Sequence, residues 1–122
     1  MAVRVFISTK LQNYPNIKKL ASDFKTYKSE QKSHFNDFKF GKDCSYNRPQ
    51  SIVDAEVDHV HLVPLHNQGN TSDRFLVYTR GFTDSDAFLI IAILEPNAHE
   101  LSRNVLNMLH LADIAEKFRN KF

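Results

Sequence analysis

The stretch Asp86–Arg103, DAFLIIAILEPNAHELSR, contains the most apolar run of the chain and decides its fold. Its eight consecutive apolar residues, 87–94, are too few to cross a bilayer, which takes about 20. Their β-branched and aromatic content, and the proline that follows them, favour a buried strand over a helix. We therefore predict a central strand, followed by a helix whose opening turns bring His99 and Arg103 to one face.

Alternating apolar and polar residues predict three further strands, over 3–8, 57–65 and 75–80. The period of two places His59 and His61 on one face of their strand, and Tyr78 and Arg80 on one face of theirs. Polar turns join the last three strands, which predicts an antiparallel meander. We expect the amino-terminal strand to pair beside the apolar run.

Two amphipathic helices complete the predicted architecture. The first follows Pro15 and buries apolar residues at helical spacing, and the second covers 97–122 with a broad apolar stripe. Between 29 and 51 the periodicity weakens, and glycine and proline predict irregular structure. The predicted fold class is α+β: one domain over 1–122, with a small antiparallel sheet (amino-terminal strand plus three-stranded meander), an N-terminal amphipathic helix and a C-terminal helix.

The composition is that of a soluble globular protein and excludes some kinds of site. A chain of 122 residues buries one core, and Cys44 is its only cysteine, so neither an intrachain disulfide nor a cysteine-based metal cluster can form. The amino-terminal residues lack the long apolar core of a signal peptide. We therefore expect a cytoplasmic protein with no membrane partner.

The charge is unevenly distributed along the chain. Residues 1–50 hold ten Lys and Arg against four Asp and Glu, whereas residues 51–122 hold six against ten. Such asymmetry indicates a polyanion or an acidic partner, although a solvated helix face gives the same pattern. The candidate RNA-binding lysines are Lys18, Lys25, Lys28, Lys32, Lys39 and Lys42. Aromatic residues interleave with the last two, as in grooves for single-stranded RNA, or else they pin a long loop onto the core.

Histidines at selected positions are the candidates for chemistry. Histidine titrates near neutral pH, and metal-free RNA cleavage needs a base for the 2′-hydroxyl, cations for the charge on the phosphorane and an acid for the departing 5′-oxygen. The candidates are His59, His61 and His99 as base and acid, Arg80 and Arg103 as cations, and Tyr78 as a stacking ring or proton donor. They converge only if the His59 face, the Tyr78 face and the start of the last helix share one side of the sheet.

Two other interpretations of these histidines stay open. A His-x-His pair on a strand, together with His99, is the ligand set of a zinc-dependent hydrolase, although no Asp or Glu stands at a familiar ligand spacing. Alternatively the histidines are structural, each hydrogen-bonded in a half-buried strand, and the chain is a non-catalytic RNA-binding module that uses its lysines.

Five short motifs follow one another along the second half of the chain. They are His59-Val60-His61-Leu62, Leu76-Val77-Tyr78, Ile91-Ala92-Ile93-Leu94-x-Pro96, His99-x-Leu101-x-Arg103 and Ala115-Glu116-x-Phe118-Arg119-x-x-Phe122. Looser matches in the first half are Phe24, Tyr27-Lys28 and Phe40-Gly41-Lys42-Asp43. With these motifs the chain resembles the YafO family of toxins from type II toxin–antitoxin pairs, within the larger RelE-like group.

The resemblance implies a RelE-like fold and a ribosome-dependent, metal-independent endoribonuclease, without a cofactor, that cuts messenger RNA during translation. It also implies a cognate antitoxin, encoded beside the toxin, that holds it inactive. The active-site candidates that it carries over are His59, His61, Tyr78, His99 and Arg103, and it adds Arg119 to the cations that meet RNA. The basic residues of the first half would then bind phosphates of ribosomal RNA.

Overall fold

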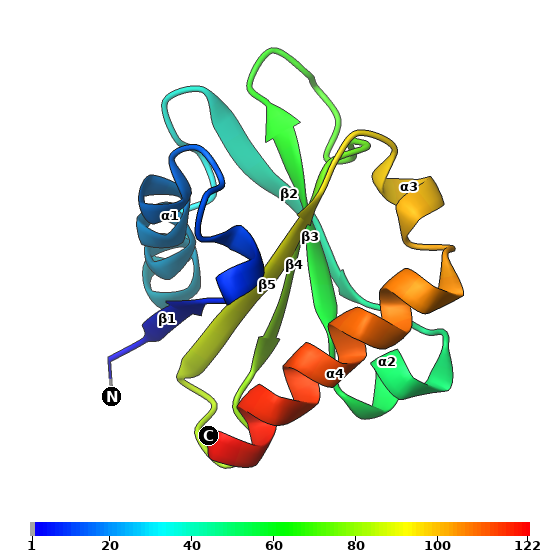
Figure 1. Ribbon diagram of the computed structural model, residues 1–122. Helices are drawn as coiled ribbons and strands as arrows, with labels where there is room; N and C mark the ends of the chain where they lie inside the picture. Colours follow the sequence, from blue (N-terminus) through cyan, green and yellow to red (C-terminus); the bar gives the residue numbers. More distant parts are fainter. Residues whose placement is uncertain (1) are drawn as a thin grey trace.

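The computed structural model describes residues 2–122 as a five-stranded sheet with helices on both faces (Figure 1). In chain order the elements are β1 (Arg4–Ile7), the short 3-10 helix η1 (Thr9–Leu11), α1 (Ile17–Glu30), β2 (Phe38–Ser45), α2 (Gln50–Asp54), β3 (Asp58–Pro64), β4 (Phe75–Arg80), β5 (Ala87–Leu94), α3 (Ala98–Leu101) and α4 (Val105–Lys121). The strand order is β1-β5-β4-β3-β2. The predicted α+β class is confirmed, but a four-stranded sheet was wrong.

The apolar run forms β5, an interior strand that pairs with β1 on one side and β4 on the other. The antiparallel meander of β3, β4 and β5 is confirmed by its register. The pairing of β1 beside β5 is also confirmed, but the two strands run parallel, so the sheet is mixed. This direction is possible because α1 and three strands intervene before the chain returns to β1, and parallel neighbours need such a long connection.

The fifth strand, β2, lies in the segment where irregular structure was predicted. It pairs antiparallel with β3 at the edge of the sheet, and its register shifts between Phe40 and Asp43. Gly41 falls at this shift, where a side chain would collide with the backbone oxygen of Asn70. The glycine therefore marks a bulge and a close backbone approach rather than a loop. Phe40 is buried, which agrees with the interpretation that these aromatics pack onto the core.

The predicted C-terminal helix is two helices. Residues 102–104 break it after α3, and α4 starts anew because the Asn104 side chain accepts the backbone N–H of Asn107 at 2.9 Å. A short helix, α2, was also not expected from the sequence. No helix within residues 2–122 has the length and apolar character that a membrane crossing requires.

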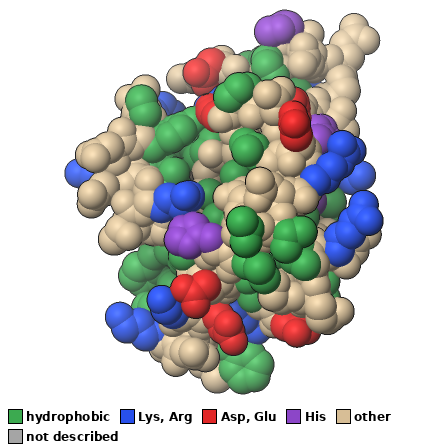
Figure 2. Space-filling model, turned by 45° about the vertical axis from the view of Figure 1, so that its right-hand side comes forward, with side chains coloured by type: hydrophobic (Ala, Val, Ile, Leu, Met, Phe, Trp, Pro, Cys, Tyr) green, Lys and Arg blue, Asp and Glu red, His purple; other side chains and the backbone are tan. Residues whose placement is uncertain are grey.

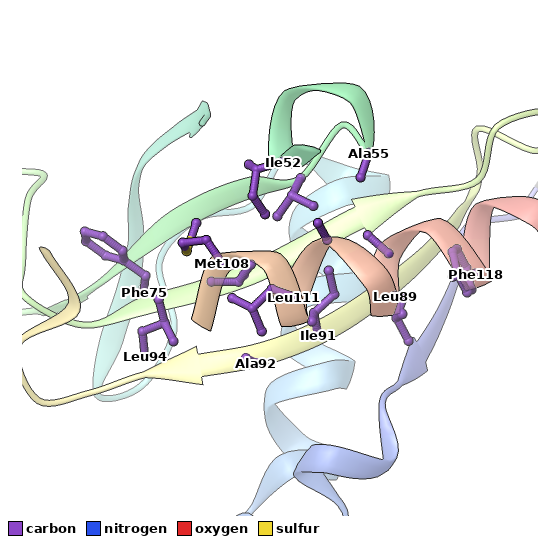
Figure 3. Packing of buried hydrophobic residues seen from close by; sticks show 14 of the residues in the cluster. Ile52, Ala55, Phe75, Leu89, Ile91, Ala92, Leu94, Met108, Leu111 and Phe118 are labelled. Atoms are coloured by element: carbon purple, nitrogen blue, oxygen red, sulfur yellow. The ribbon is translucent and has the colours of Figure 1, made fainter. Parts of the chain in front are cut away.

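Each face of the sheet has its own hydrophobic core. On one face α1 packs on Val60, Leu76 and Ile90, whereas on the other α2 and α4 pack on Val77 and Ile91. Figure 3 shows the second core, with Met108, Leu111 and Phe118 of α4 packed among residues of the sheet and of α2, and Phe75 at the end near Leu94. Because side chains alternate between faces, the two cores decide which candidate site residues can meet.

Candidate functional site

Three histidines gather on the α4 side of the sheet, around the ring of Phe75. His59 and His61 project from β3 on the face that bears Phe75, and His99 belongs to α3. The ring centroids of His61 and His99 lie 5.8 Å apart, and those of His59 and His61 lie 5.9 Å apart. The Phe75 ring is 4.4 Å from His61 and 5.0 Å from His99. The structure therefore brings His99 to two candidates that precede it by about 40 residues in the sequence.

His99 is the exposed member of this histidine cluster and is held by Asp73. Its Nδ1 lies 2.7 Å from Asp73 Oδ1, and its backbone N–H donates to the same oxygen at 2.9 Å. These hydrogen bonds hold the pKa of Asp73 below its usual range, so the carboxylate is ionised at neutral pH. A carboxylate on Nδ1 favours the tautomer with the proton on that nitrogen, which leaves Nε2 free to accept a proton. The geometry at His99 is the one that a general base requires.

His61 is buried and packs against the ring of His99. The residue is only 3% exposed, and its Nδ1 accepts the backbone N–H of Ser72 at 2.8 Å. Burial and the nearby His99 lower the pKa of His61. Because an N–H donor at Nδ1 requires a lone pair there, His61 stays neutral with its proton on Nε2. It is poorly placed to take up a proton itself.

His59 is half-buried, two residues before His61 on β3, and is also neutral at pH 7. Its ring stacks on Tyr46 at 4.1 Å between centroids, and its Nε2 lies 3.6 Å from Cys44 Sγ. Burial lowers the pKa of His59 to about 4, with a further contribution from His61. Its buried Nδ1 has no hydrogen-bond partner among the described residues. His59 therefore supports the cluster rather than exchanging protons at neutral pH.

The low pKa of His59 makes the stability of the fold depend on pH. Below about pH 6.5 the unfolded chain binds a proton at His59, whereas the folded protein keeps the ring neutral down to about pH 4. The contribution of His59 to the free energy of unfolding is therefore fully present above about pH 6.5 and is lost as the pH is lowered toward 4. Because the ring is only half-buried, we expect a loss of about 1 kcal/mol between pH 6.5 and pH 5.

Urea unfolding at a series of pH values measures this dependence. His59→Gln removes the titrating ring, so its free energy of unfolding should change less with pH than that of the wild type between pH 6.5 and pH 5. Identical slopes for the two proteins over this interval would mean that His59 titrates normally in the folded state.

Tyr78 does not join the histidines, because it points to the α1 side of β4. Its hydroxyl accepts from Lys28 Nζ at 2.8 Å and donates to Asp43 Oδ1 at 2.7 Å. Asp43 Oδ2 also accepts from Tyr27 and from Lys28. Tyr78 is 2% exposed, and burial followed by the charge of Asp43 raises its pKa. The condition that both strand faces share one side of the sheet is therefore not met.

These four residues form a second cluster, which we call the Lys28–Asp43 network. The ammonium of Lys28 lies 3.0 Å from Asp43 and 4.5 Å from the centre of the Tyr78 ring, so one cation is paired with both a carboxylate and an aromatic face. The side chains of Lys28 and Asp43 are 15% and 19% exposed. Tyr27, Lys28 and Asp43, which belong to the looser motif matches in the first half of the chain, thus contact one another and Tyr78 in a structural network.

The predicted RNA-binding cations do not form one surface. Lys18, Lys25 and Lys32 are exposed on or just after α1, across the sheet from the histidines. Lys42 is exposed on β2, and its charge lowers the pKa values of His59 and His61. The remaining cations lie elsewhere: Lys28 in the network, Lys39 buried, Arg80 beside Phe88, and Arg119 bound to Glu56 and to the Arg80 carbonyl oxygen. Lys42 is thus the basic side chain that acts on the histidine cluster.

Arg103 is exposed in the turn between α3 and α4, not on a helix face shared with His99. The helix that would have aligned them ends at Leu101. Sequence reasoning also missed Asp73 and Ser72, which fix His99 and His61. Both residues lie in the polar loop before β4, which the sequence marks only as a turn. Their pairing with His99 and His61 is seen only in the folded chain.

The zinc interpretation lacks a suitable ligand set. Among residues 2–122, no three side chains of His, Cys, Asp or Glu are grouped so that they could hold a metal ion. Nδ1 of His61 accepts from the backbone of Ser72, so its Nε2 carries the proton and neither ring nitrogen has a lone pair left for a metal. The geometry instead fits a base with an orienting carboxylate.

Comparison with known proteins places the chain in a family. The model of the YafO toxin of type II toxin–antitoxin systems matches residues 25–120. One relative, the mRNA interferase toxin YafO of Escherichia coli (strain K12), is 35% identical over 95 residues, covering 68% of this chain and 72% of the relative. No solved structure matches the chain, so the RelE-like fold stays a prediction. The chain belongs to the YafO family of toxins from type II toxin–antitoxin systems.

Proposed function

We propose that this toxin is an mRNA interferase, a cytoplasmic endoribonuclease that cleaves messenger RNA on the ribosome and thereby inhibits translation. The observation that carries the proposal is the pair of His99 and Asp73, a solvent-exposed imidazole with a carboxylate on Nδ1, beside the neutral ring of His61. The relative named as an mRNA interferase supports the same substrate class. The reaction is metal-independent and uses no cofactor.

In the proposed reaction, Nε2 of His99 removes the proton of the ribose 2′-hydroxyl. The 2′-oxygen attacks the adjacent phosphorus, and the bond from phosphorus to the 5′-oxygen breaks, which leaves a 2′,3′-cyclic phosphate. The 5′-oxygen takes its proton from water, because the site is open to solvent at His99. Asp73 stabilises the imidazolium that forms on His99, as a carboxylate does in a catalytic triad.

Cations and positioning residues complete the proposed site. Lys42 and Arg103 are the exposed basic side chains proposed to neutralise charge on the phosphorane. His61 acts as a positioning residue that packs against the ring of His99, and His59 packs in turn against His61. Tyr78, Arg80 and Lys28 support the fold from other places and are not proposed to contact the reacting phosphate.

The division of basic residues supports a role on the ribosome. Lys18, Lys25 and Lys32 face away from the histidines, so one face of the toxin can hold a large RNA while the other meets the message. Phosphate contacts of this kind position a protein without reading sequence. We propose ribosomal RNA as the ligand of this α1 surface, with Lys39 and Arg119 contributing only to the folded framework.

Primer extension on a reporter transcript tests the function. The transcript is incubated with purified toxin in a translating extract and, separately, free of ribosomes. We expect cuts within the translated region of the first sample and none in the second. Cuts in both samples would remove ribosome dependence but keep the nuclease, whereas intact transcript in both would refute the proposed activity.

A further inference from the structure

The amino-terminal half of α4 presents large apolar side chains to solvent. Val105 is 58% exposed, Leu106 79% and Leu109 44%, and Val53 of the adjacent α2 is 37% exposed. Positions 105, 106 and 109 share one helix face because residues three and four apart are neighbours. Figure 2 shows hydrophobic side chains gathered at the centre of this side of the molecule, with Lys and Arg side chains along one edge. Exposed apolar groups that cluster in this way mark interaction surfaces.

A groove adjoins this apolar face. Its volume is about 380 Å³, and its lining residues are Arg48, Pro49, Ser102, Arg103, Val105 and Met108. We call the groove and the exposed residues of α4 beside it the α4 groove. Its two arginines are exposed and have no acidic partner among residues 2–122, whereas Arg4, Arg74 and Arg119 all form ion pairs. The nearby Asp54 is bound to Gln50.

We propose that the α4 groove is the docking site for an acidic, amphipathic helix of the cognate antitoxin. Apolar residues on one face of such a helix would cover Leu106 and Leu109, and carboxylates beside them would pair with Arg48 and Arg103. Exposed aliphatic side chains fit a protein partner better than RNA, whose bases stack on aromatic rings. The inference depends on membership of a toxin–antitoxin family and not on the proposed cleavage chemistry.

The position of the groove explains how such a partner would inhibit the toxin. Ser102 lines the groove, and its hydroxyl lies 2.8 Å from the hydroxyl of Tyr46, whose ring stacks on His59. Arg103 lines the groove four residues after His99. A helix seated there lies beside the histidine cluster and occupies Arg103, one of the two cations proposed to meet the RNA phosphate.

Titration calorimetry with the purified cognate antitoxin tests the docking site. Leu106→Asp places an acid on the second residue of α4, where a helix tolerates negative charge well, and Arg48→Glu reverses a groove cation. We expect each to weaken antitoxin binding at least about 30-fold, as interface hot spots do. The matched controls are Phe82→Asp, which is 73% exposed outside the groove, and Lys121→Glu at the other end of α4. Each control should change Kd by less than about threefold.

The readouts separate this inference from the proposed function. Leu106→Asp and Arg48→Glu should cleave reporter RNA like the wild type when no antitoxin is added, and should resist antitoxin when it is. Wild-type antitoxin affinity in both variants overturns the docking site, even if cleavage is normal. Normal antitoxin affinity with weakened RNA binding would instead make the groove an RNA surface. A toxin that cleaves no RNA refutes the proposed activity but leaves the binding measurement valid.

Discussion

His99→Ala is expected to lower the rate of messenger RNA cleavage by about a thousandfold, the range of a lost general base. The residue lies on the surface, with its side chain 56% exposed, so its removal should leave the free energy of unfolding nearly unchanged. Single-turnover cleavage of a reporter transcript on purified ribosomes measures the effect. Bacteria expressing the variant without antitoxin should grow, because translation continues.

Asp73→Asn tests the contribution of the carboxylate that holds His99 in the same cleavage assay. The amide keeps the shape of the side chain but loses the charge that stabilises the imidazolium of His99, so we expect a loss of about tenfold to a hundredfold. His110→Ala, an exposed histidine on α4, is the matched control and should cleave normally. Full activity in His99→Ala would contradict the base assignment outright, and full activity in Asp73→Asn would show that His99 needs no charged partner.

Asp43→Ala is expected to lower the free energy of unfolding by about 3 kcal/mol, because it leaves the mostly buried ammonium of Lys28 without its carboxylate. Tyr27 and Tyr78 lose their hydrogen-bond acceptor in the same step. Urea unfolding at pH 7.5 measures the change. We expect toxicity to fall through loss of folded protein, with ribosome-dependent cleavage per folded molecule retained.

Two further variants distinguish the cost of leaving a buried charge unpaired from the cost of removing a carboxylate as such. Asp113→Ala removes the acidic partner of an exposed pair with Lys117 and should cost less than about 0.5 kcal/mol. Lys28→Met in the Asp43→Ala background removes the stranded cation and should recover part of the stability. If Asp43→Ala costs no more than Asp113→Ala, the network does not stabilise the fold as its burial indicates.

Local sequence pattern predicted most of the framework correctly. The apolar run 87–94 predicts a buried strand, and the alternation in 57–65 and 75–80 predicts two more. Strands joined by short polar turns pair antiparallel with their neighbours in sequence, so the meander also follows from the sequence. The pattern failed at β2, where Gly41 marks a bulge against Asn70, and at residues 102–104, where Asn104 starts a new helix inside an apolar stripe. Both failures come from contacts with distant or capping groups.

The sequence alone also determined the toxin family, since its motifs keep their order along the chain, and named the three histidines as candidates. Only the tertiary structure decided which candidates meet. The register of β3 against β4 sets His59 opposite Val77, so Tyr78 lies on the α1 face, away from His59 and His61, while a loop before β4 brings Asp73 to His99. Side-chain direction along one strand follows from its period of two. The pairing of residues 26 positions apart depends on how the sheet and α3 pack, which no local pattern specifies.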